Sequence, residues 1–330
     1  MALNGRQRIV VLGGGSGGVV AATSLGRRLG AAHDVTLIDR RADHVYMPAF
    51  LSLMIGERRP RDITRPLDRL ARRNVRVITG EIEGIDLARQ EVRLADEVVP
   101  YDHLVISLGL QTRPEAIPGF TEAANHAWEM DAALRLQEKL ARFEGGRVVI
   151  GVPPGPFRCP PAPYEAQYVL HDYFVRRGVR SQVKMDFFTR DPMPRGPAHD
   201  PAIWMDAHAR RRGITQHYSF AVESIDPERR VVQGRFGLAL DYDLLFLVPP
   251  HEPARVLVDS HIADSVAGVR VDFDTLETRW ENVYAIGDCA DVPASKAGVV
   301  AHQEADVVAH NIAVKITGRG DPQTLRLHTM

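Results

Sequence analysis

The chain has 330 residues, 45% of them hydrophobic and 25% charged, as in a soluble globular protein of about two domains. Its 41 Lys and Arg residues balance 42 Asp and Glu residues, so the net charge offers no long-range attraction for nucleic acid or an acidic membrane. Two cysteines are too few for a disulfide framework and favour a reducing compartment. The N-terminus lacks a signal-peptide pattern, and no apolar run approaches the roughly 20 residues that span a bilayer. We therefore expect a cytoplasmic protein.

Strands alternate with helical patterns along the chain, which is typical of parallel α/β domains. The first part is predicted to hold a strand at 8–12, a helix at about 17–29, and strands at 35–39, 76–79, 91–94 and 104–107. The remainder is predicted to hold helices at 132–143, 164–177, 201–212 and about 299–316, and strands at 183–189, 244–248 and 282–286.

The sequence contains an internal repeat. The first copy runs from the strand RQRIVVL through EGID (83–86) to PYDHLVISLG (100–109). The second runs from GRVVIG (146–151) through ESID (223–226) to DYDLLFLVPP (241–250). The repeat predicts two Rossmann-like dinucleotide-binding domains of the FAD/NAD(P)-binding, pyridine nucleotide-disulfide oxidoreductase type, with the second inserted in the first. We expect the FAD-binding domain to comprise 1–112 and 268–330, because the last helix packs back on the first copy, and the second domain to comprise 113–267.

The first copy keeps a phosphate-binding loop. Gly13, Gly15 and Gly18 form a GxGxxG motif between a strand and a helix, where backbone amides approach a pyrophosphate. Asp39 ends the next strand, and a carboxylate there suits a ribose diol. A glycine-rich turn without a ligand is the alternative. Neighbouring residues that we assign to the same cofactor site are Ser16, Gly17, Arg40 and Gly109.

A second motif near the C-terminus distinguishes between cofactors. The stretch NVYAIGDCAD (282–291) ends a strand in Gly287 and Asp288, and it resembles the second FAD fingerprint of flavoproteins with two dinucleotide domains. In that resemblance the aspartate binds the ribityl and phosphate region of the flavin. A helix cap is the alternative for Asp288. The two motifs together predict FAD, whereas either one alone does not. Cys289 follows directly and is interpreted as a small apolar filler.

The second copy has lost its glycine loop. The stretch VPPGPFRCPPAPYE (152–165) occupies that position, and its prolines deny a pyrophosphate its backbone cradle. Cys159 lies a few residues before a helix and beside Arg158, both of which favour a thiolate. Glu165 opens the helix and is a candidate proton shuttle. The alternatives are a structural thiol at Cys159 and, at Glu165, a charge that simply favours the helix dipole.

Over about 1–318 the chain resembles the sulfide:quinone oxidoreductase and flavocytochrome c sulfide dehydrogenase family of FAD-dependent oxidoreductases. The resemblance is carried by the phosphate loop and by four further segments: HVYMPAF (44–50), PFRCPPAPYEAQYVLHDYFVRRGVR (156–180), YAIGDCAD (284–291) and SKAGVVAHQEADVVAHNIA (295–313). It implies that Cys159 lies at the flavin face and takes up sulfide sulfur with a second cysteine near the C-terminus. It also implies that electrons pass through FAD to a quinone or a cytochrome, and that Lys296 approaches the flavin pyrimidine. A solvated lysine is the alternative for Lys296.

Members of this family usually continue for tens of residues past the position of Gly318, with the second redox cysteine and the apolar elements that seat a quinone. On this resemblance the C-terminal tail is missing, and we expect neither a two-cysteine cycle nor a complete quinone site. The expected partners are a small sulfur substrate and a quinone acceptor, with a homo-oligomer or a peripheral contact on the inner face of the membrane. Neither a metal nor a nucleic acid is expected. An NAD(P)H-dependent dehydrogenase or disulfide reductase and a catalytically degenerate flavin-binding protein are the alternative functions.

Overall fold

The protein is described by a computed structural model that covers residues 5–193, 199–264 and 266–327. The chain divides into two compact units. Unit 1 comprises Met1–Val45, Thr64–Gln111 and Glu252–Met330, and unit 2 comprises Tyr46–Ile63 and Thr112–His251.

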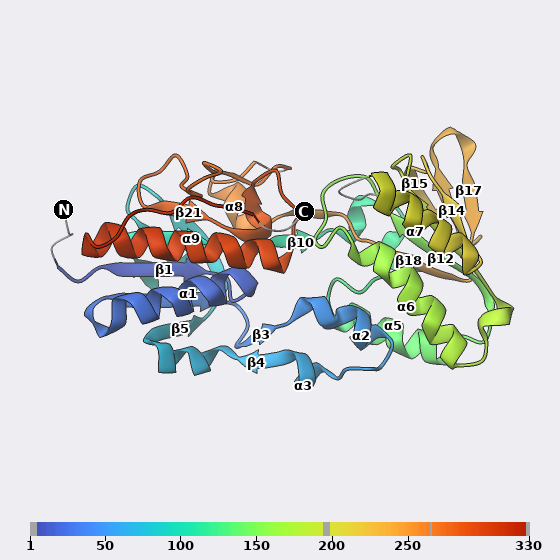
Figure 1. Cartoon of the computed structure of the whole chain (residues 1–330), viewed down its shortest axis with the longest axis horizontal. Coiled ribbons are helices and arrows are strands. Elements are labelled where there is room, and N and C mark those ends of the chain that lie inside the picture. Colours follow the sequence, from blue (N-terminus) through green and yellow to red (C-terminus); the bar gives the residue numbers. More distant parts are fainter. Residues whose placement is uncertain (1–4, 194–198, 265, 328–330) are drawn as a thin grey trace. The chain divides into compact units, whose positions relative to one another are not determined.

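Unit 1 is built on a parallel sheet of order β21-β9-β1-β2-β5. Its strands are β1 (Arg8–Leu12), β2 (Asp34–Asp39), β5 (Val75–Thr79), β9 (His103–Ile106) and β21 (Val283–Ala285). Helices α1 (Ser16–Leu29) and α9 (Gly298–Thr317) pack side by side along it (Figure 1). The buried residues of α1 are mostly Gly and Ala, which lets the two helices approach closely.

An antiparallel sheet, β6-β7-β8, completes the core of unit 1. Its strands are β6 (Ile82–Asp86), β7 (Glu91–Leu94) and β8 (Val98–Pro100), and their apolar side chains join the same hydrophobic cluster as those of the parallel sheet. The smaller elements are β3 (Asp43–Val45), β4 (Thr64–Pro66), α8 (Arg255–Asp259), β20 (Val269–Arg270) and β22 (Ala290–Asp291).

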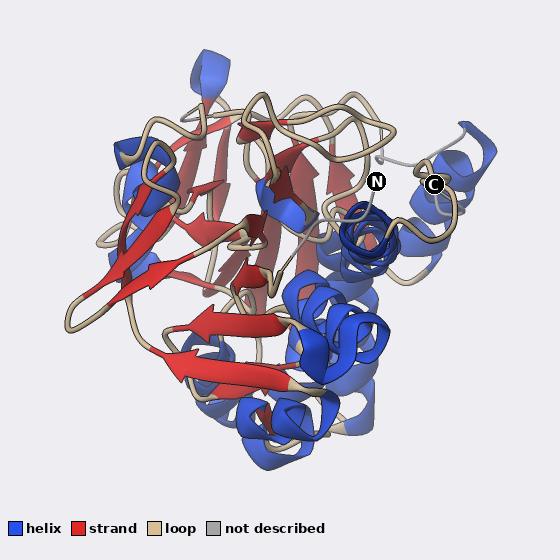
Figure 2. Cartoon of the chain, turned by 90° about the vertical axis from the view of Figure 1, so that its left-hand side faces the viewer, coloured by secondary structure: helices blue, strands red, loops and turns tan. Residues whose placement is uncertain are grey.

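Unit 2 repeats this plan with a parallel sheet of order β11-β18-β12-β13-β14. Its strands are β11 (Ala124–Asn125), β12 (Gly146–Val152), β13 (Val183–Thr189), β14 (Ile214–His217) and β18 (Leu244–Leu247). An antiparallel sheet follows, made of β15 (Val222–Asp226), β16 (Val231–Gly234) and β17 (Ala239–Asp241). The helices are α2 (Phe50–Met54), α3 (Pro60–Ile63), α4 (Phe120–Ala123), α5 (Met130–Arg142), α6 (Ala162–Arg176) and α7 (His199–Arg211). Strands β10 (Leu110–Thr112) and β19 (His251–Pro253) pair where the chain passes from one unit to the other. Figure 2 shows the strands in red and the helices in blue.

The internal repeat predicted from the sequence extends to individual hydrogen bonds. Asp102 accepts a bond from the backbone N–H of Arg8 at 2.7 Å, and Asp243 accepts one from the backbone N–H of Arg147 at 2.7 Å. The antiparallel sheets each contain a register shift after their first residue pair. Two doubly wound folds of one plan therefore form the chain, as the sequence predicts.

The observed units differ from the expected boundaries at Thr112, which lies in unit 2, and over two longer segments. Residues 252–267 lie in unit 1, because β6 and the end of α8 meet there, with Ile85 N donating to Ser260 Oγ at 3.2 Å. Residues 46–63 lie in unit 2, where the Gln137 side chain donates to the Leu53 carbonyl at 3.0 Å. Neither contact is visible in local sequence patterns, because the partners are far apart along the chain.

Candidate functional site

The glycine loop of unit 1 connects β1 to α1, and two of its glycines are required by the fold. Gly13 has a φ of +99°, and a Cβ there would lie 2.3 Å from the Ser107 carbonyl oxygen. A Cβ on Gly18 would lie 1.8 Å from the Gly13 carbonyl oxygen. Gly15 is different, since a Cβ at this position would meet no atom of the described residues within 4 Å and its φ is −73°. Open space above Gly15 is what a bound pyrophosphate needs.

Two helix N-termini meet beside this loop. The N-cap residues of α1 and α9, Gly15 and Ala297, make no side-chain capping hydrogen bond. A Cβ on Gly298 would lie 3.3 Å from Ser16 Oγ, so the two helices begin next to one another. The N–H groups of both first turns therefore create a region of positive potential that suits an anion.

Asp39 braces the loop from the end of β2. Its side chain is buried, and one carboxylate oxygen accepts a bond from Gly14 N at 2.6 Å. The other accepts a bond from Arg41 N at 2.7 Å. Each oxygen keeps a second lone pair, so a ribose hydroxyl remains compatible with this arrangement and the ribose contact stays a prediction. Arg40 is exposed to solvent.

The Gly287–Asp288 turn follows β21 at the same edge of the sheet. Gly287 has a φ of +73°, and its N–H donates to the Glu304 carboxylate at 2.5 Å. Asp288 is half-buried. The ammonium of Lys296 donates to the Ala290 carbonyl at 2.5 Å, so its position is fixed by the backbone.

Cys289 and Gly109 lie behind this turn. The Cys289 thiol is fully buried 3.3 Å from the Ile286 carbonyl oxygen, and burial raises its pKa to about 11. This environment agrees with the interpretation of Cys289 as a small core residue. Gly109 has a φ of +65° with open space around its Cα, which is a conformation that glycine adopts without strain.

The residues of unit 1 fit FAD. The glycine loop leaves room for a pyrophosphate at Gly15, and two uncapped helix N-termini supply donors for it. The acidic end of β2 lies beside the loop. The residues that would hold the cofactor are therefore Gly13, Gly15, Ser16, Gly17, Gly18, Asp39, Gly287 and Asp288.

The loop with Cys159 occupies the matching place in unit 2, between the end of β12 and the start of α6. Cys159 is half-buried with a φ of +55°, a left-handed conformation that is uncommon for residues with a side chain. Its carbonyl oxygen accepts a bond from Ala162 N at 2.9 Å at the beginning of α6. Glu165 is exposed in the first turn of this helix.

Trp128 clamps the residue that precedes Cys159. The indole Nε1 donates to the Arg158 carbonyl at 2.9 Å, and the Arg158 guanidinium donates to the Trp128 carbonyl at 2.7 Å. The same guanidinium lies 3.1 Å from the Met47 sulfur. Arg158 therefore fixes the loop as well as supplying a positive charge near Cys159.

Two buried histidines stand near Arg158. His126 and His251 are each 6% exposed, and burial lowers their pKa values to about 4 and about 3. The charge of Arg158 lowers both pKa values further. Both imidazoles are therefore neutral at neutral pH, and His251 Nδ1 lies 2.7 Å from the Pro249 carbonyl oxygen. Since a carbonyl accepts, this nitrogen carries the proton.

The predicted site residues thus form two groups, each within its own unit. The cofactor residues come together in unit 1, whereas Cys159 and Glu165 belong to unit 2. Sequence reasoning missed Glu304, Trp128, His126 and His251. Glu304 carried a signal, because it is a carboxylate on an otherwise apolar helical stripe that includes Ala301, Ala305 and Val308. Nothing in the sequence links Trp128 to a loop 30 residues away.

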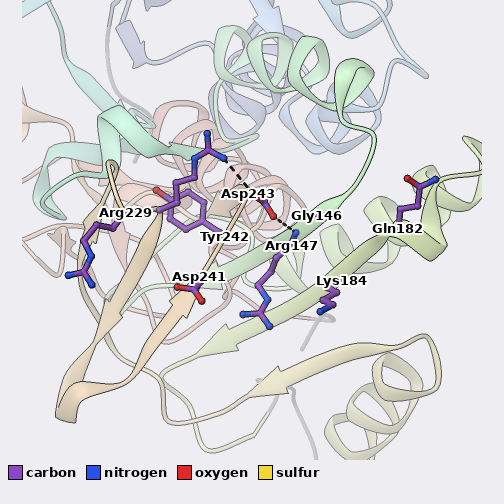
Figure 3. Close-up of a pocket in the computed structure, with 9 residues that line it drawn as sticks. Gly146, Arg147, Gln182, Lys184, Arg229, Asp241, Tyr242 and Asp243 are labelled. Carbon is purple, nitrogen blue, oxygen red and sulfur yellow. Dashed lines mark hydrogen bonds and ion pairs between the residues drawn. The ribbon is translucent and has the colours of Figure 1, made fainter.

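A separate polar hollow of about 560 Å³ lies at the amino ends of β12 and β13 (Figure 3). It is lined by Gly146, Arg147, Gln182, Lys184, Arg229, Arg230, Asp241, Tyr242 and Asp243. Asp243 is held there by Arg147 N at 2.7 Å and by the Arg230 guanidinium at 3.7 Å. The hollow is at the opposite end of β12 from the Cys159 loop, and none of the predicted site residues lines it.

The described residues contain neither a membrane-spanning helix nor a cluster of metal-binding side chains. No helix among them is both long and apolar enough to cross a membrane. Within the same residues, His, Cys, Asp and Glu side chains form no group of three or more that could hold a metal ion.

Comparisons with known proteins agree with this geometry. Residues 7–152 match the family model of pyridine nucleotide-disulphide oxidoreductases, and residues 133–249 match the central part of the flavoprotein chain of flavocytochrome c sulfide dehydrogenase. The chain is 26% identical over 323 residues to a mitochondrial sulfide:quinone oxidoreductase of Dictyostelium discoideum, which covers 92% of this chain and 70% of the relative.

Two further comparisons involve Aquifex aeolicus. The sulfide-quinone reductase of strain VF5 is 29% identical over 350 residues, covering 97% of this chain and 79% of the relative. The X-ray structure of the sulfide:quinone oxidoreductase from this hyperthermophilic bacterium superposes with a TM-score of 0.85 at 27% identity, covering 94% of this chain and 77% of that chain.

Proposed function

We propose that this chain, which belongs to the sulfide:quinone oxidoreductase and flavocytochrome c sulfide dehydrogenase-like family of FAD-dependent oxidoreductases, oxidises sulfide or a small persulfide at Cys159. The proposed electron acceptor is a quinone. The observation that carries the proposal is the loop of unit 2, in which a clamped cysteine stands where unit 1 has its phosphate-binding glycines.

The loop of unit 2 argues against a second dinucleotide. Prolines at positions 153, 154, 156, 160 and 161 remove backbone N–H donors from the loop and the helix start. A nicotinamide cofactor bound in the ordinary way places its pyrophosphate on such donors. One FAD and no NAD(P) is therefore the expected cofactor content.

Each residue of the loop has a proposed role. Cys159 takes up the sulfur atom, and its position just before α6 favours the thiolate that reacts. The clamp between Trp128 and Arg158 restricts where this sulfur lies. Glu165 is exposed, so it exchanges protons with solvent. When bound, FAD supplies a two-electron acceptor.

The test is anaerobic mixing of the purified holoprotein with sulfide, followed by the flavin absorbance. Sulfide is expected to bleach the flavin in the parent and in Cys289→Ser, but not in Cys159→Ser. Cys289→Ser is the matched control, because its thiol is buried and its pKa is raised to about 11. A soluble quinone analogue then tests the proposed acceptor: recovery of the absorbance supports a quinone, and no recovery argues against it.

Equal bleaching rates in the two cysteine variants would contradict the role of Cys159. Stoichiometric bleaching by NADH would instead favour the NAD(P)H-dependent alternative. A flavin that responds to neither reagent would support a binding protein without turnover.

A further inference from the structure

The buried face of α9 carries an acidic side chain. Glu304 is 0% exposed and lies among Ala301, Ala305 and Val308 on the side of the helix that packs into unit 1. A carboxylate in such a place requires hydrogen bonds or a counter-charge.

The hydrogen bonds of Glu304 are incomplete. One oxygen, Oε2, accepts the Gly287 N–H at 2.5 Å. The other, Oε1, meets no hydrogen-bonding partner among the described residues although it is fully enclosed. An ionised carboxylate would leave negative charge on that oxygen without a donor, whereas a neutral acid with its proton on Oε1 leaves only an uncharged hydroxyl unpaired, which costs less.

The charged groups around Glu304 do not compensate fully for its burial. Burial is the largest effect and raises the pKa of Glu304 to about 7. The Gly287 N–H and Lys296 favour the charged form and Asp288 disfavours it. The buried face of α1, which packs along α9, consists of Gly, Ala and Leu and carries no charge. The neighbouring Cys289 thiol is neutral at pH 7, because burial raises its pKa to about 11. On α9 itself, the exposed residues His302 and Asp306 face one another at 3.5 Å.

The turn that Glu304 holds lies against the glycine loop. A Cβ on Gly17 would approach Ile286 Cδ1 to 3.3 Å, and a Cβ on Gly287 would approach the Ala301 Cβ to 3.3 Å. The start of α1, the Gly287–Asp288 turn and α9 are therefore in direct contact. A negative charge on Glu304 would add to that of Asp288 close to the region that receives the FAD pyrophosphate.

We propose that Glu304 positions the Gly287–Asp288 turn in its neutral, protonated form, and that loss of this proton weakens the binding of FAD. Binding of the anionic cofactor holds the proton on Glu304 more tightly, so binding above neutral pH is accompanied by proton uptake. The inference concerns cofactor affinity, and it holds whichever substrate reduces the flavin.

The test measures release of FAD from the diluted holoprotein by flavin fluorescence at pH 6, 7 and 8. The dissociation constant of the parent is expected to rise about tenfold from pH 6 to pH 8. Glu304→Gln keeps an oxygen for Gly287 N and cannot ionise, so its affinity is expected to stay near the pH 6 value of the parent throughout. Asp306→Asn is the control on the same helix, and it is expected to retain the tenfold change. His44→Gln is a second control, because His44 Nδ1 lies 2.8 Å from the Gly14 carbonyl oxygen at the loop. This variant is also expected to retain the tenfold change.

A second readout is the infrared spectrum of the parent holoprotein. A carbonyl band of a neutral carboxylic acid is expected at pH 6 and is expected to persist at pH 8, because bound FAD holds the proton on Glu304 more tightly. The same band is expected to be lost at pH 8 from protein stripped of FAD. A parent whose FAD affinity does not change with pH, or whose infrared spectrum lacks this band at pH 6, would overturn the inference even if Glu304→Gln fails to fold. The same pH dependence in parent and Glu304→Gln would also overturn it.

Discussion

The two copies of the dinucleotide fold differ where a strand meets the following helix. The hydrogen bonds to Asp102 and Asp243 make Arg8 and Arg147 equivalent, so Val152 occupies the place of Gly13. Gly13 leads within three residues into α1, whereas β12 continues through Val152 and a proline-rich loop precedes α6. The sheets, registers and backbone hydrogen bonds are otherwise repeated. One fold thus carries a phosphate-binding glycine loop in one copy and a proline-rich loop with a cysteine at the matching junction of the other.

The two cysteines offer the largest expected difference between the units. Iodoacetamide reacts with thiolates, and an ordinary thiol with a pKa of about 8.5 holds roughly 300-fold more thiolate at neutral pH than one at about 11. We expect Cys159, which is half-buried, to be labelled much faster than Cys289, which is fully buried. Peptide mass spectrometry over time measures both rates. Similar rates for the two thiols would show that unit 1 opens as readily as the loop of unit 2.

The next largest effect is expected at the phosphate-binding glycine loop of unit 1. Gly15→Val introduces a side chain into open space, so the fold is expected to survive while the pyrophosphate loses its place. Loss of its amide contacts corresponds to about 3 kcal/mol, or roughly a 100-fold weaker binding of FAD. Flavin absorbance and circular dichroism of the purified variant report the two properties separately.

Gly18→Ala is the matched comparison, because its Cβ would meet the Gly13 carbonyl oxygen at 1.8 Å and disrupt the fold itself. A yellow Gly15→Val protein with the flavin content of the parent would contradict the prediction that the FAD pyrophosphate binds at Gly15.

The support for Cys159 is expected to have a smaller effect. Trp128→Phe removes the hydrogen bond to the Arg158 carbonyl but keeps a ring that can pack on Phe246, whose centroid is 5.9 Å away. We expect a loss of about 1 kcal/mol in the free energy of unfolding, measured with urea, and faster alkylation of Cys159. Unchanged alkylation would mean that the clamp does not restrict this loop.

The smallest expected effect is a difference in stability between variants of two equivalent residues, Asp102 and Asp243. Asp102 receives the Arg8 guanidinium at 2.7 Å, a bond that lowers the pKa of Asp102, whereas the guanidinium nearest Asp243 is 3.7 Å away. We expect Asp102→Asn to cost about 1 kcal/mol of unfolding free energy and Asp243→Asn a few tenths.

A lowered carboxyl pKa in the folded state stabilises the protein above the ordinary aspartate pKa, and this contribution disappears as the pH falls below it. The difference between parent and Asp102→Asn in urea unfolding is therefore expected to shrink at acid pH. An equal cost for the two variants at neutral pH would show that the guanidinium of Arg8 adds nothing to its backbone bond.

The sequence predicts the fold well because the relevant signals are local. The signals are apolar strands, a glycine loop at a strand–helix junction and the repeated EGID and ESID segments, and each of them spans only a few residues. The fold class follows from their order along the chain. The predicted helix ends differ from the observed ones by at most two residues, as for α6 at Ala162–Arg176.

The supporting residues of the site could not be predicted in the same way. Trp128 meets Arg158 across a helix and a strand, and Glu304 meets Gly287 across a loop. Such pairs depend on tertiary packing, which leaves no periodic pattern around either partner. The reassignment of 46–63 to unit 2 has the same origin, because Gln137 and Leu53 are far apart in sequence.

The open position at Gly15 has an evolutionary consequence. Gly13 and Gly18 are required by the backbone itself, whereas no described residue occupies the space that a side chain at 15 would fill. A lineage that ceased to bind FAD would therefore be free to accumulate larger residues at position 15 while positions 13 and 18 stayed glycine. The identity of this one residue among descendants would record whether the cofactor was still in use, even where every helix and strand of the fold had been retained.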